Sequence, residues 1–148
     1  MIKRILLASF VILSIASCKK EHIPRAQLLA NKAWKQTTYT VSPAIYDAGQ
    51  YITDLYALME DCEKDDYREF LLPNVYKQNR GQIHCQTYEA QELTGVWYLD
   101  ATETILTISY NGVTNLNIQY LDENTLIYSY SLVLGSTNYV VTKTWVKQ

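Results

Sequence analysis

The sequence contains few of the residues that enzymes use most often for acid and base chemistry. Its only histidines are His22 and His84. It has no nucleophile elbow, zinc-protease helix, P-loop or dinucleotide-binding glycine motif. His84 is next to Cys85, where a place in a loop or at a strand end suits it better than a role as a general base. These absences predict a protein that is not an enzyme and has no cofactor.

Positive charge is also scarce, and so are long apolar runs. The chain has 13 Lys and Arg against 15 Asp and Glu, with a formal net charge of −2. Nucleic-acid-binding domains are usually basic, so we expect no nucleic-acid partner. The N-terminal apolar run covers only residues 5–15 and is interrupted by serine. It is too short for a transmembrane helix, which needs about 20 residues.

What the N-terminus does contain is the pattern of a secretory signal. Lys3 and Arg4 precede the apolar run at 5–15, and small residues follow it. The sequence Ile15-Ala16-Ser17-Cys18 resembles the lipobox of bacterial lipoproteins, in which signal peptidase II cuts directly before a lipidated cysteine. We therefore expect acylation, such as palmitate, at Cys18. An ordinary signal peptide is the alternative.

The lipobox implies a simple organisation. Residues 1–17 are the expected lipoprotein signal peptide, residues 18–23 a lipidated tether, and residues 24–148 one folded domain. Several acyl chains on Cys18 anchor a protein stably in the lipid bilayer, where a single chain does not. Lys19 stands where some bacteria use Asp to retain lipoproteins in the inner membrane. We therefore expect an outer-membrane lipoprotein, at the periplasmic face or the cell surface.

Two cysteines remain after Cys18 is used. Cys62 and Cys85 form an even pair in an exported chain, for which a disulfide is the default. It would close a loop of about 24 residues and stabilise the fold by roughly 3 kcal/mol. A site with two metal-binding thiolates is the alternative, but zinc sites usually place cysteines about two to four residues apart. We expect the disulfide and no metal site.

Residues 59–70, MEDCEKDDYREF, are rich in carboxylates. The calcium-loop pattern Asp-x-Asp-x-Asp-Gly is absent. Asp65 and Asp66 lie where a loop enters a predicted strand, so we interpret the acids as groups that cap this turn and keep it in water. Loose calcium binding by the carboxylates of Asp61–Glu69 is the functional alternative that stays open.

Most of the remaining sequence alternates between apolar and polar residues, which is typical of strands. A short helix is expected at 24–32, a loop at 42–50 and a helix-like piece at Tyr51–Cys62. Hairpin signals such as Asn111-Gly112 join the later strands and make neighbours antiparallel. About eight strands are predicted, at 33–41, 66–71, 75–78, 95–100, 103–110, 113–121, 125–132 and 139–146.

Alternation also predicts which side chains face inward. One apolar side is expected to form the interior, with the polar side outside. The last strand is ambiguous, because Val141 and Trp145 compete with Val140 and Val146. The predicted interior residues are Leu106, Ile108, Tyr110, Leu116, Ile118, Tyr120, Leu126, Tyr128, Tyr130 and Leu132.

The order of short motifs resembles that of the bacterial lipocalin-like lipoproteins. That family has a lipobox, a Leu-containing segment, a strand beginning with Trp, and Cys-x-x-Asp-(Asp/Asn) before a Phe-containing strand. A second Cys and Gly-x-Trp follow, before a run of hairpin strands. Nearly the whole chain after the lipobox is covered. The corresponding residues are Cys18, Leu28-Leu29, Trp34, Cys62 to Asp66, Phe70, Cys85 and Gly95-Val96-Trp97.

The resemblance implies a small β-barrel, a Cys62–Cys85 disulfide and a location in the cell envelope, but no agreed activity. Two positions depart from the family. Lys32 replaces a Gly two residues before the first Trp, and Pro73-Asn74 replaces an Asp-Gly hairpin turn. We predict an all-β fold for residues 24–148: an up-and-down antiparallel eight-stranded lipocalin-like β-barrel with a short N-terminal helix.

Two functions fit this fold. The first is a non-enzymatic, membrane-anchored lipoprotein that binds a small apolar or amphipathic ligand. The second is a structural or interaction lipoprotein, with a filled barrel that docks on an envelope protein partner. An interior cavity of at least about 300 Å³ favours the first, and a core filled by tyrosines favours the second. The expected ligand-lining residues are Trp97, Tyr110, Tyr120, Tyr128 and Tyr130.

Overall fold

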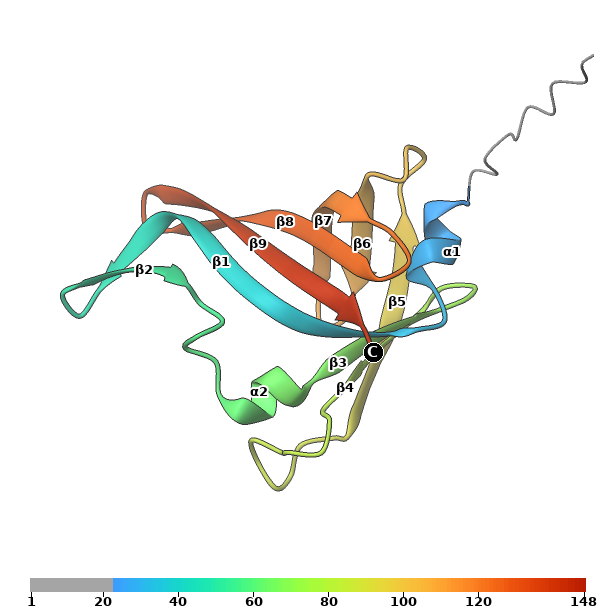
Figure 1. Cartoon of the computed structure of the whole chain (residues 1–148), viewed down its shortest axis with the longest axis horizontal. Coiled ribbons are helices and arrows are strands. Elements are labelled where there is room, and N and C mark those ends of the chain that lie inside the picture. The colour runs from blue at the N-terminus through green and yellow to red at the C-terminus, as the bar shows by residue number, and fades with distance from the viewer. Residues whose placement is uncertain (1–22) are drawn as a thin grey trace, which may run out of the picture.

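A computed structural model describes residues 23–148 of the chain (Figure 1). Within them, a 9-stranded antiparallel sheet is accompanied by two short helices, α1 (Arg25–Leu29) and α2 (Asp61–Asp65). No helix in this part of the chain is long and apolar enough to cross a membrane. The strands are β1 (Ala33–Asp47), β2 (Gln50–Asp54), β3 (Tyr67–Leu71), β4 (Val75–Asn79), β5 (Glu92–Leu99), β6 (Ile105–Ser109), β7 (Val113–Leu121), β8 (Thr125–Leu134) and β9 (Thr137–Lys147).

Eight of these strands close into a barrel. From β3 to β9 each strand pairs with the next along the chain, and β9 pairs with β1 from Trp34 to Ser42. The first residues of β1, Ala33–Lys35, pair with β3 and complete the ring. Closure leaves no open edge in the ring itself. The predicted all-β, up-and-down antiparallel barrel with a short N-terminal helix is confirmed.

The loop predicted at 42–50 is wrong. β1 continues to Asp47, turns at Ala48-Gly49 and returns as β2. Ala48 and Gly49 have φ values of 46° and 86°, the left-handed geometry of a two-residue hairpin turn. Pro43, which suggested a loop, lies where the register between β1 and β2 shifts. A missing N–H is tolerated at such an irregularity.

The helix predicted at Tyr51–Cys62 is wrong over most of its length. Its first residues belong to β2, and only Asp61 onwards is helical, in α2. Tyr51 is 78% exposed and lies opposite Tyr46 across the β1–β2 hairpin, with 5.1 Å between ring centroids. Backbone pairing with β1 therefore outweighs the helix-like spacing of the apolar residues.

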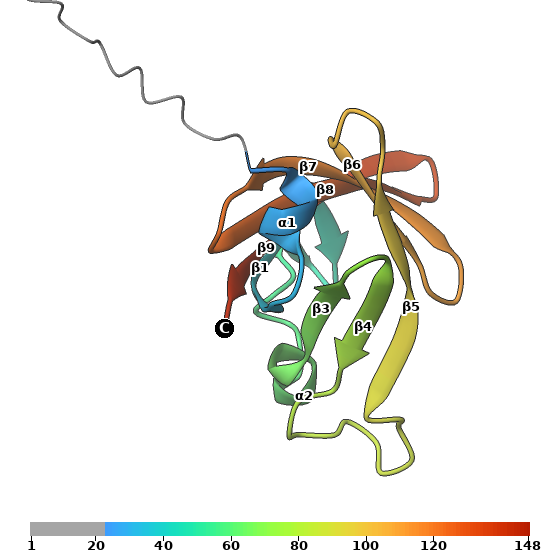
Figure 2. The same ribbon diagram turned by 90° about the vertical axis from the view of Figure 1, so that its right-hand side faces the viewer.

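Helix α1 lies across one end of the barrel (Figure 2). Large buried side chains fill that end. The Trp34 Nε1–H donates to the Leu29 carbonyl at 2.9 Å, and the Trp97 Nε1–H donates to the Leu71 carbonyl at 3.0 Å. The Phe70 and Trp97 rings meet edge to face, 5.6 Å between centroids. Because both indole N–H groups have backbone acceptors, the two tryptophans pack into this end without an unsatisfied donor.

The inner face of β9 resolves the ambiguity left by the sequence. Val141 and Trp145 are buried, whereas Val140 is 48% exposed. Lys143 lies between the two buried residues in the alternation and therefore shares their inward face. A positive charge thus enters the barrel interior from β9.

Candidate ligand-binding site

A cavity of about 270 Å³ occupies the half of the barrel remote from α1. It lies towards the end of β4 and the turn between β6 and β7, whereas the Trp34 and Trp97 core fills the other half. Its walls come from β3, β4, β6, β7, β8 and β9. The lining residues are Arg68, Tyr76, Gln78, Ile108, Tyr110, Thr114, Leu116, Tyr128, Tyr130 and Lys143.

The cavity walls combine apolar, aromatic and cationic groups. Ile108 and Leu116 are buried apolar side chains, and tyrosine rings surround them. Arg68 and Lys143 add two positive charges, and no carboxylate is among the lining residues. Such walls suit a ligand with an apolar body and a polar group.

Arg68 points inward because it alternates with buried Phe70 on β3. Its Nη1 donates a hydrogen bond to the Tyr128 hydroxyl at 3.0 Å. The guanidinium lies over the Trp145 ring, 4.5 Å from the centroid, and 6.0 Å from the Tyr76 centroid. Aromatic faces stabilise a cation in this way, and Arg is better suited to it than Lys.

Lys143 approaches the same region from β9. Its Nζ lies 4.0 Å from the Tyr39 ring centroid, and in the sheet it is opposite Tyr128. Burial, and then the positive charge of Arg68, lower the pKa of Lys143 to about 8, against the opposing effect of Glu63. Lys143 is therefore mostly protonated at pH 7 and loses its charge as the pH rises through 8.

The tyrosine hydroxyls of the cavity act as neutral hydrogen-bonding groups. Burial raises the pKa of both Tyr128 and Tyr130 above its usual value. Both hydroxyls keep their protons at neutral pH, so each can donate one hydrogen bond and accept others.

Three of the five predicted lining residues reach the cavity: Tyr110, Tyr128 and Tyr130. Trp97 does not. It is only 2% exposed, belongs to the filled half of the barrel, and borders a separate surface hollow beside α1. Its place in the core follows from the hydrogen bond of its indole to Leu71.

The predicted inward orientation of Tyr120 is wrong. Its side chain is 49% exposed, and its hydroxyl donates to the Asp122 carboxylate at 2.8 Å. The register of β7 against β8 shifts between Ile118 and Tyr120. An extra residue in one strand reverses the faces that follow it, so Tyr120 points outward although Ile118 points inward.

Arg68, Tyr76, Gln78 and Lys143 are cavity residues that the sequence did not single out. The signal for Arg68 was the alternation from Phe70, and for Lys143 the alternation from Trp145. A charged residue inside an apolar pattern looks like a break in it, so the pattern alone marks neither residue as facing inward.

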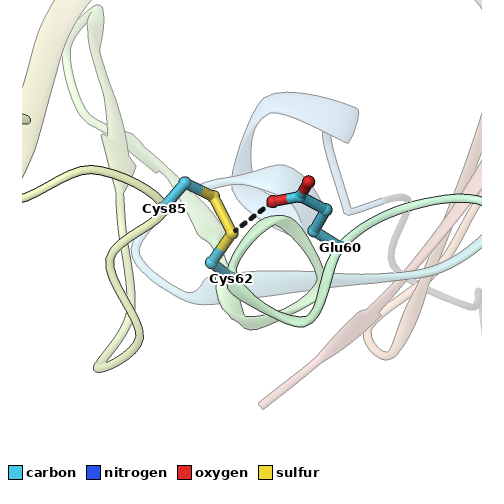
Figure 3. Close-up of side chains that lie close together, drawn as sticks. All are labelled: Glu60, Cys62 and Cys85. Carbon is cyan, nitrogen blue, oxygen red and sulfur yellow. Dashed lines mark hydrogen bonds between the residues drawn. A yellow bond between two sulfur atoms is a disulfide. The ribbon is translucent and has the colours of Figure 1, made fainter.

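The predicted Cys62–Cys85 disulfide is confirmed and lies outside this cavity (Figure 3). It joins α2 to the loop between β4 and β5. A carboxylate oxygen of Glu60 lies 3.5 Å from the Cys62 sulfur. Among residues 23–148, Glu60 and the two cysteines are the one group of three closely spaced metal-ligand types. Because the sulfurs are bonded to each other, neither is a thiolate that could hold a metal.

Four acids of the 59–70 segment, Glu60, Glu63, Asp65 and Asp66, have structural partners. Glu60 and Glu63 form a capping box at the start of α2. Asp65 accepts hydrogen bonds from the backbone N–H groups of Gln82 and Ile83, which lower the pKa of its carboxyl. These contacts hold α2 to the β4–β5 loop beside the disulfide.

Asp66 connects the same segment to β4. It accepts hydrogen bonds from Arg80 and from the Gln78 side chain, each at 3.0 Å. Gln78 in turn lines the cavity. The interpretation of these acids as groups that organise the turn fits the contacts, and Asp66 in addition orients a cavity side chain.

The expected lipidation site Cys18 and the signal peptide at residues 1–17 lie outside the described residues.

Comparison with known proteins shows distant structural similarity. No family model matches the chain, and no curated protein matches it in sequence. The bovine lipocalin allergen Bos d 2 is 12% identical, with a TM-score of 0.44 over 83% of this chain and 75% of that chain. A deswapped triple mutant of bovine odorant-binding protein is 14% identical, with a TM-score of 0.41 over 82% and 74%.

A complex of bovine odorant-binding protein with a selenium-containing odorant is also similar. It is 14% identical, with a TM-score of 0.42 over 88% of this chain and 76% of that chain. The strand pairing of this chain, and not these similarities, defines its closed barrel.

Proposed function

We propose that this protein binds a small amphipathic ligand inside its barrel and is held at a membrane by an acylated Cys18. The observation that carries the proposal is the cavity of about 270 Å³ above a filled core. An eight-stranded barrel filled by its own side chains throughout would offer no such site.

The size of the cavity limits the ligand. Its volume of about 270 Å³ falls just short of the value of about 300 Å³ that we set as favouring ligand binding, which is also the lower end of the usual range for small-molecule sites, about 300–1,000 Å³. At about 30 Å³ for a water-sized group, it holds on the order of nine nonhydrogen atoms. The ligand is therefore small, or only one end of it enters the barrel.

Native mass spectrometry of the mature protein, purified from its own membranes, tests ligand binding. We expect an added mass that is lost on denaturation. Thr114→Trp, which narrows the cavity, should reduce the bound fraction. Val113→Trp is the matched control, because Val113 is 68% exposed on the opposite face of the same strand. No added mass in any preparation, or equal loss in both variants, contradicts the proposal.

Membrane attachment is tested separately by Cys18→Ala. The support for it is the sequence Ile15-Ala16-Ser17-Cys18. Fractionation of cells should find wild type in the membrane and the variant outside it. The variant lacks the cysteine that carries the acyl chains, and two or more chains are needed for stable anchoring. A processed variant that still sediments with membranes rejects the anchor without affecting the cavity.

A second function, docking on an envelope protein, is favoured by the β1–β2 and β8–β9 hairpins. Both extend away from the barrel (Figure 1). Their exposed residues include Tyr46 at 64%, Tyr51 at 78% and Val133 at 65%. Replacing Tyr46 and Tyr51 by Ser should abolish the binding of an envelope protein that co-purifies with wild type. The cavity variant Thr114→Trp is the control and should still bind that protein. A partner retained by the double variant counts against this surface.

A further inference from the structure

We propose that the cavity selects an anionic amphiphile, whose carboxylate is held by Arg68 and Lys143 and whose apolar tail lies against Ile108 and Leu116. This inference rests on the proposed ligand-binding function and specifies the chemical class of the ligand. The juxtaposition of two cations with an apolar wall in one cavity carries it.

The first step is that neither cation forms a salt bridge in the part of the chain that the structure describes, although the charges of Glu63 and Asp66 act at longer range on Lys143 and Arg68. The ion pairs there are Lys35–Asp65, Lys77–Glu92 and Arg80–Asp66. Asp66 is near Arg68 in sequence, but Arg80 and Gln78 occupy it. Charges removed from bulk water are normally paired, so two unpaired cations in one cavity indicate a site for a negative group.

The second step is that hydrogen-bonding capacity is left over. A guanidinium has five N–H donors, and Arg68 directs one side-chain hydrogen bond, to the Tyr128 hydroxyl. Its planar donor groups match the two oxygens of a carboxylate. Its other contacts are cation–π contacts, with the Trp145 ring centroid at 4.5 Å and the Tyr76 ring centroid at 6.0 Å.

The third step is that Arg68 and Lys143 lie beside the same part of the cavity. Tyr128 bonds to Arg68 from β8 and lies opposite Lys143 in the sheet. Tyr130, one inward position further along β8, supplies a protonated hydroxyl beside them. A carboxylate placed there meets two positive charges and a hydroxyl donor, whereas an ammonium group meets repulsion.

The fourth step is the opposite wall. Ile108 on β6 and Leu116 on β7 are buried and apolar, and they face the cavity with Tyr110. Burial of a short alkyl chain there is favourable because it removes apolar surface from water. Octanoate has a single carboxylate and a short chain, and its size is close to that of the cavity. It is therefore a suitable probe.

Titration calorimetry with octanoate, 1-octanol and octylammonium tests the inference. We expect octanoate to bind about tenfold or more tightly than octanol, the gain of a charge-assisted hydrogen bond. Octylammonium should bind more weakly than either. Acetate, which has the same charged group and almost no chain, should bind more weakly than octanoate. Equal binding of acetate and octanoate would show that the alkyl chain adds no affinity, and would overturn the proposal of an amphiphilic ligand.

Single substitutions test whether each cation binds the ligand, and a separate measurement checks that the variant is folded. Arg68→Gln and Lys143→Met should each reduce octanoate affinity about tenfold and leave octanol affinity unchanged. Lys77→Met is the control, since Lys77 is paired with Glu92 outside the cavity. Near-ultraviolet circular dichroism checks each fold. Should Arg68→Gln fail to fold, the lysine variant and the unmodified protein still decide the outcome.

The pH dependence provides an independent readout. Because an anion favours the charged lysine, octanoate affinity should be highest below pH 8 and decrease severalfold by pH 9. Octanol affinity, and octanoate affinity in Lys143→Met, should stay flat over the same range. If octanoate affinity in the wild type does not change with pH, Lys143 does not bind the carboxylate. The groups that face Lys143 are Tyr39 from β1, Arg68 from β3, Tyr128 and Tyr130 from β8, and Glu63 from α2.

These results distinguish two kinds of failure. Equal binding of octanoate and octanol keeps the proposed ligand-binding function and overturns the charge selectivity. Tighter binding of octylammonium than of octanoate would likewise overturn the charge selectivity and keep the ligand-binding function. If no probe binds, while native mass spectrometry also finds no ligand, both proposals fail.

Discussion

Tyr128 connects the cavity with the core of the barrel. Its hydroxyl accepts the hydrogen bond of Arg68, and its ring stacks with Trp145 at 6.1 Å between centroids. The side chain is only 2% exposed. One residue therefore contributes both to packing and to the position of the guanidinium.

We expect Tyr128→Ala to lower the free energy of unfolding by about 3 kcal/mol, because it removes a large buried ring. Tyr120→Ala should change stability little, since the Tyr120 ring lies on the outer surface. Urea denaturation of both variants measures the difference. Similar losses in the two variants would show that Tyr120 also packs in the interior.

Asp65 should make stability depend on pH in the acid range. Its backbone hydrogen bonds lower the pKa of the folded state below the ordinary 3.8, so its contribution is complete above that value. As pH falls through the lowered pKa, the contribution is lost. The urea midpoint of wild type should fall more between pH 5 and pH 2.5 than that of Asp65→Asn.

Asp61→Asn is the matched control for this change, because Asp61 is exposed and lies four residues before Asp65, which forms the ion pair with Lys35. It should follow the wild-type pH profile. Parallel profiles for wild type and Asp65→Asn would remove Asp65 as the acid-sensitive group.

At the level of single residues, sequence patterns predicted the interior well only where no bulge and no charge intervened. Tyr110, Tyr128 and Tyr130 were found because alternation runs undisturbed to each of them. Tyr120 was misplaced because a shift in register leaves no mark in the residue types. Lys143 was missed because its cost of burial is offset by contacts from other strands, which a single sequence does not show.

Among the elements, β1 has the most varied partners. It pairs with β9 along one side, and with β3 and then β2 along the other. The segment between β2 and β3, with α2, leaves the barrel wall at the point where β1 changes partner. The Cys62–Cys85 disulfide fixes this segment to the β4–β5 loop.

Replacing both Cys62 and Cys85 by Ala should lower the free energy of unfolding by about 3 kcal/mol, the entropy of the loop that the bond closes. We expect the barrel to remain folded, because its strand pairing does not include either cysteine. Urea midpoints of the double variant and the oxidised parent give the value. An unchanged midpoint contradicts a stabilising role.

The strands of the C-terminal half were predictable because short turns such as Asn111-Gly112 leave few other arrangements. The predicted boundaries of β7, 113–121, are those observed. The β1–β2 hairpin was not predictable in the same way. Its turn, Ala48-Gly49, is a weaker signal, and Pro43 suggested a break that the irregular pairing absorbs.

As a whole, the molecule divides into a filled half and a hollow half. Tryptophan and phenylalanine side chains pack the half beside α1, and tyrosine and cationic side chains surround the cavity in the other. The overall barrel followed from strand number and connectivity. The division between its halves did not, because it depends on how inward side chains from distant strands meet.

The position of α1 has a consequence for a chain anchored at Cys18. Ile23 is five positions after Cys18, a reach of at most about 18 Å. If Cys18 is acylated as proposed, the packed end that α1 covers follows the anchor directly in the chain, and the cavity lies at the other end of the barrel. With the packed end toward the bilayer, a ligand from the membrane would have to leave it before it could enter the cavity.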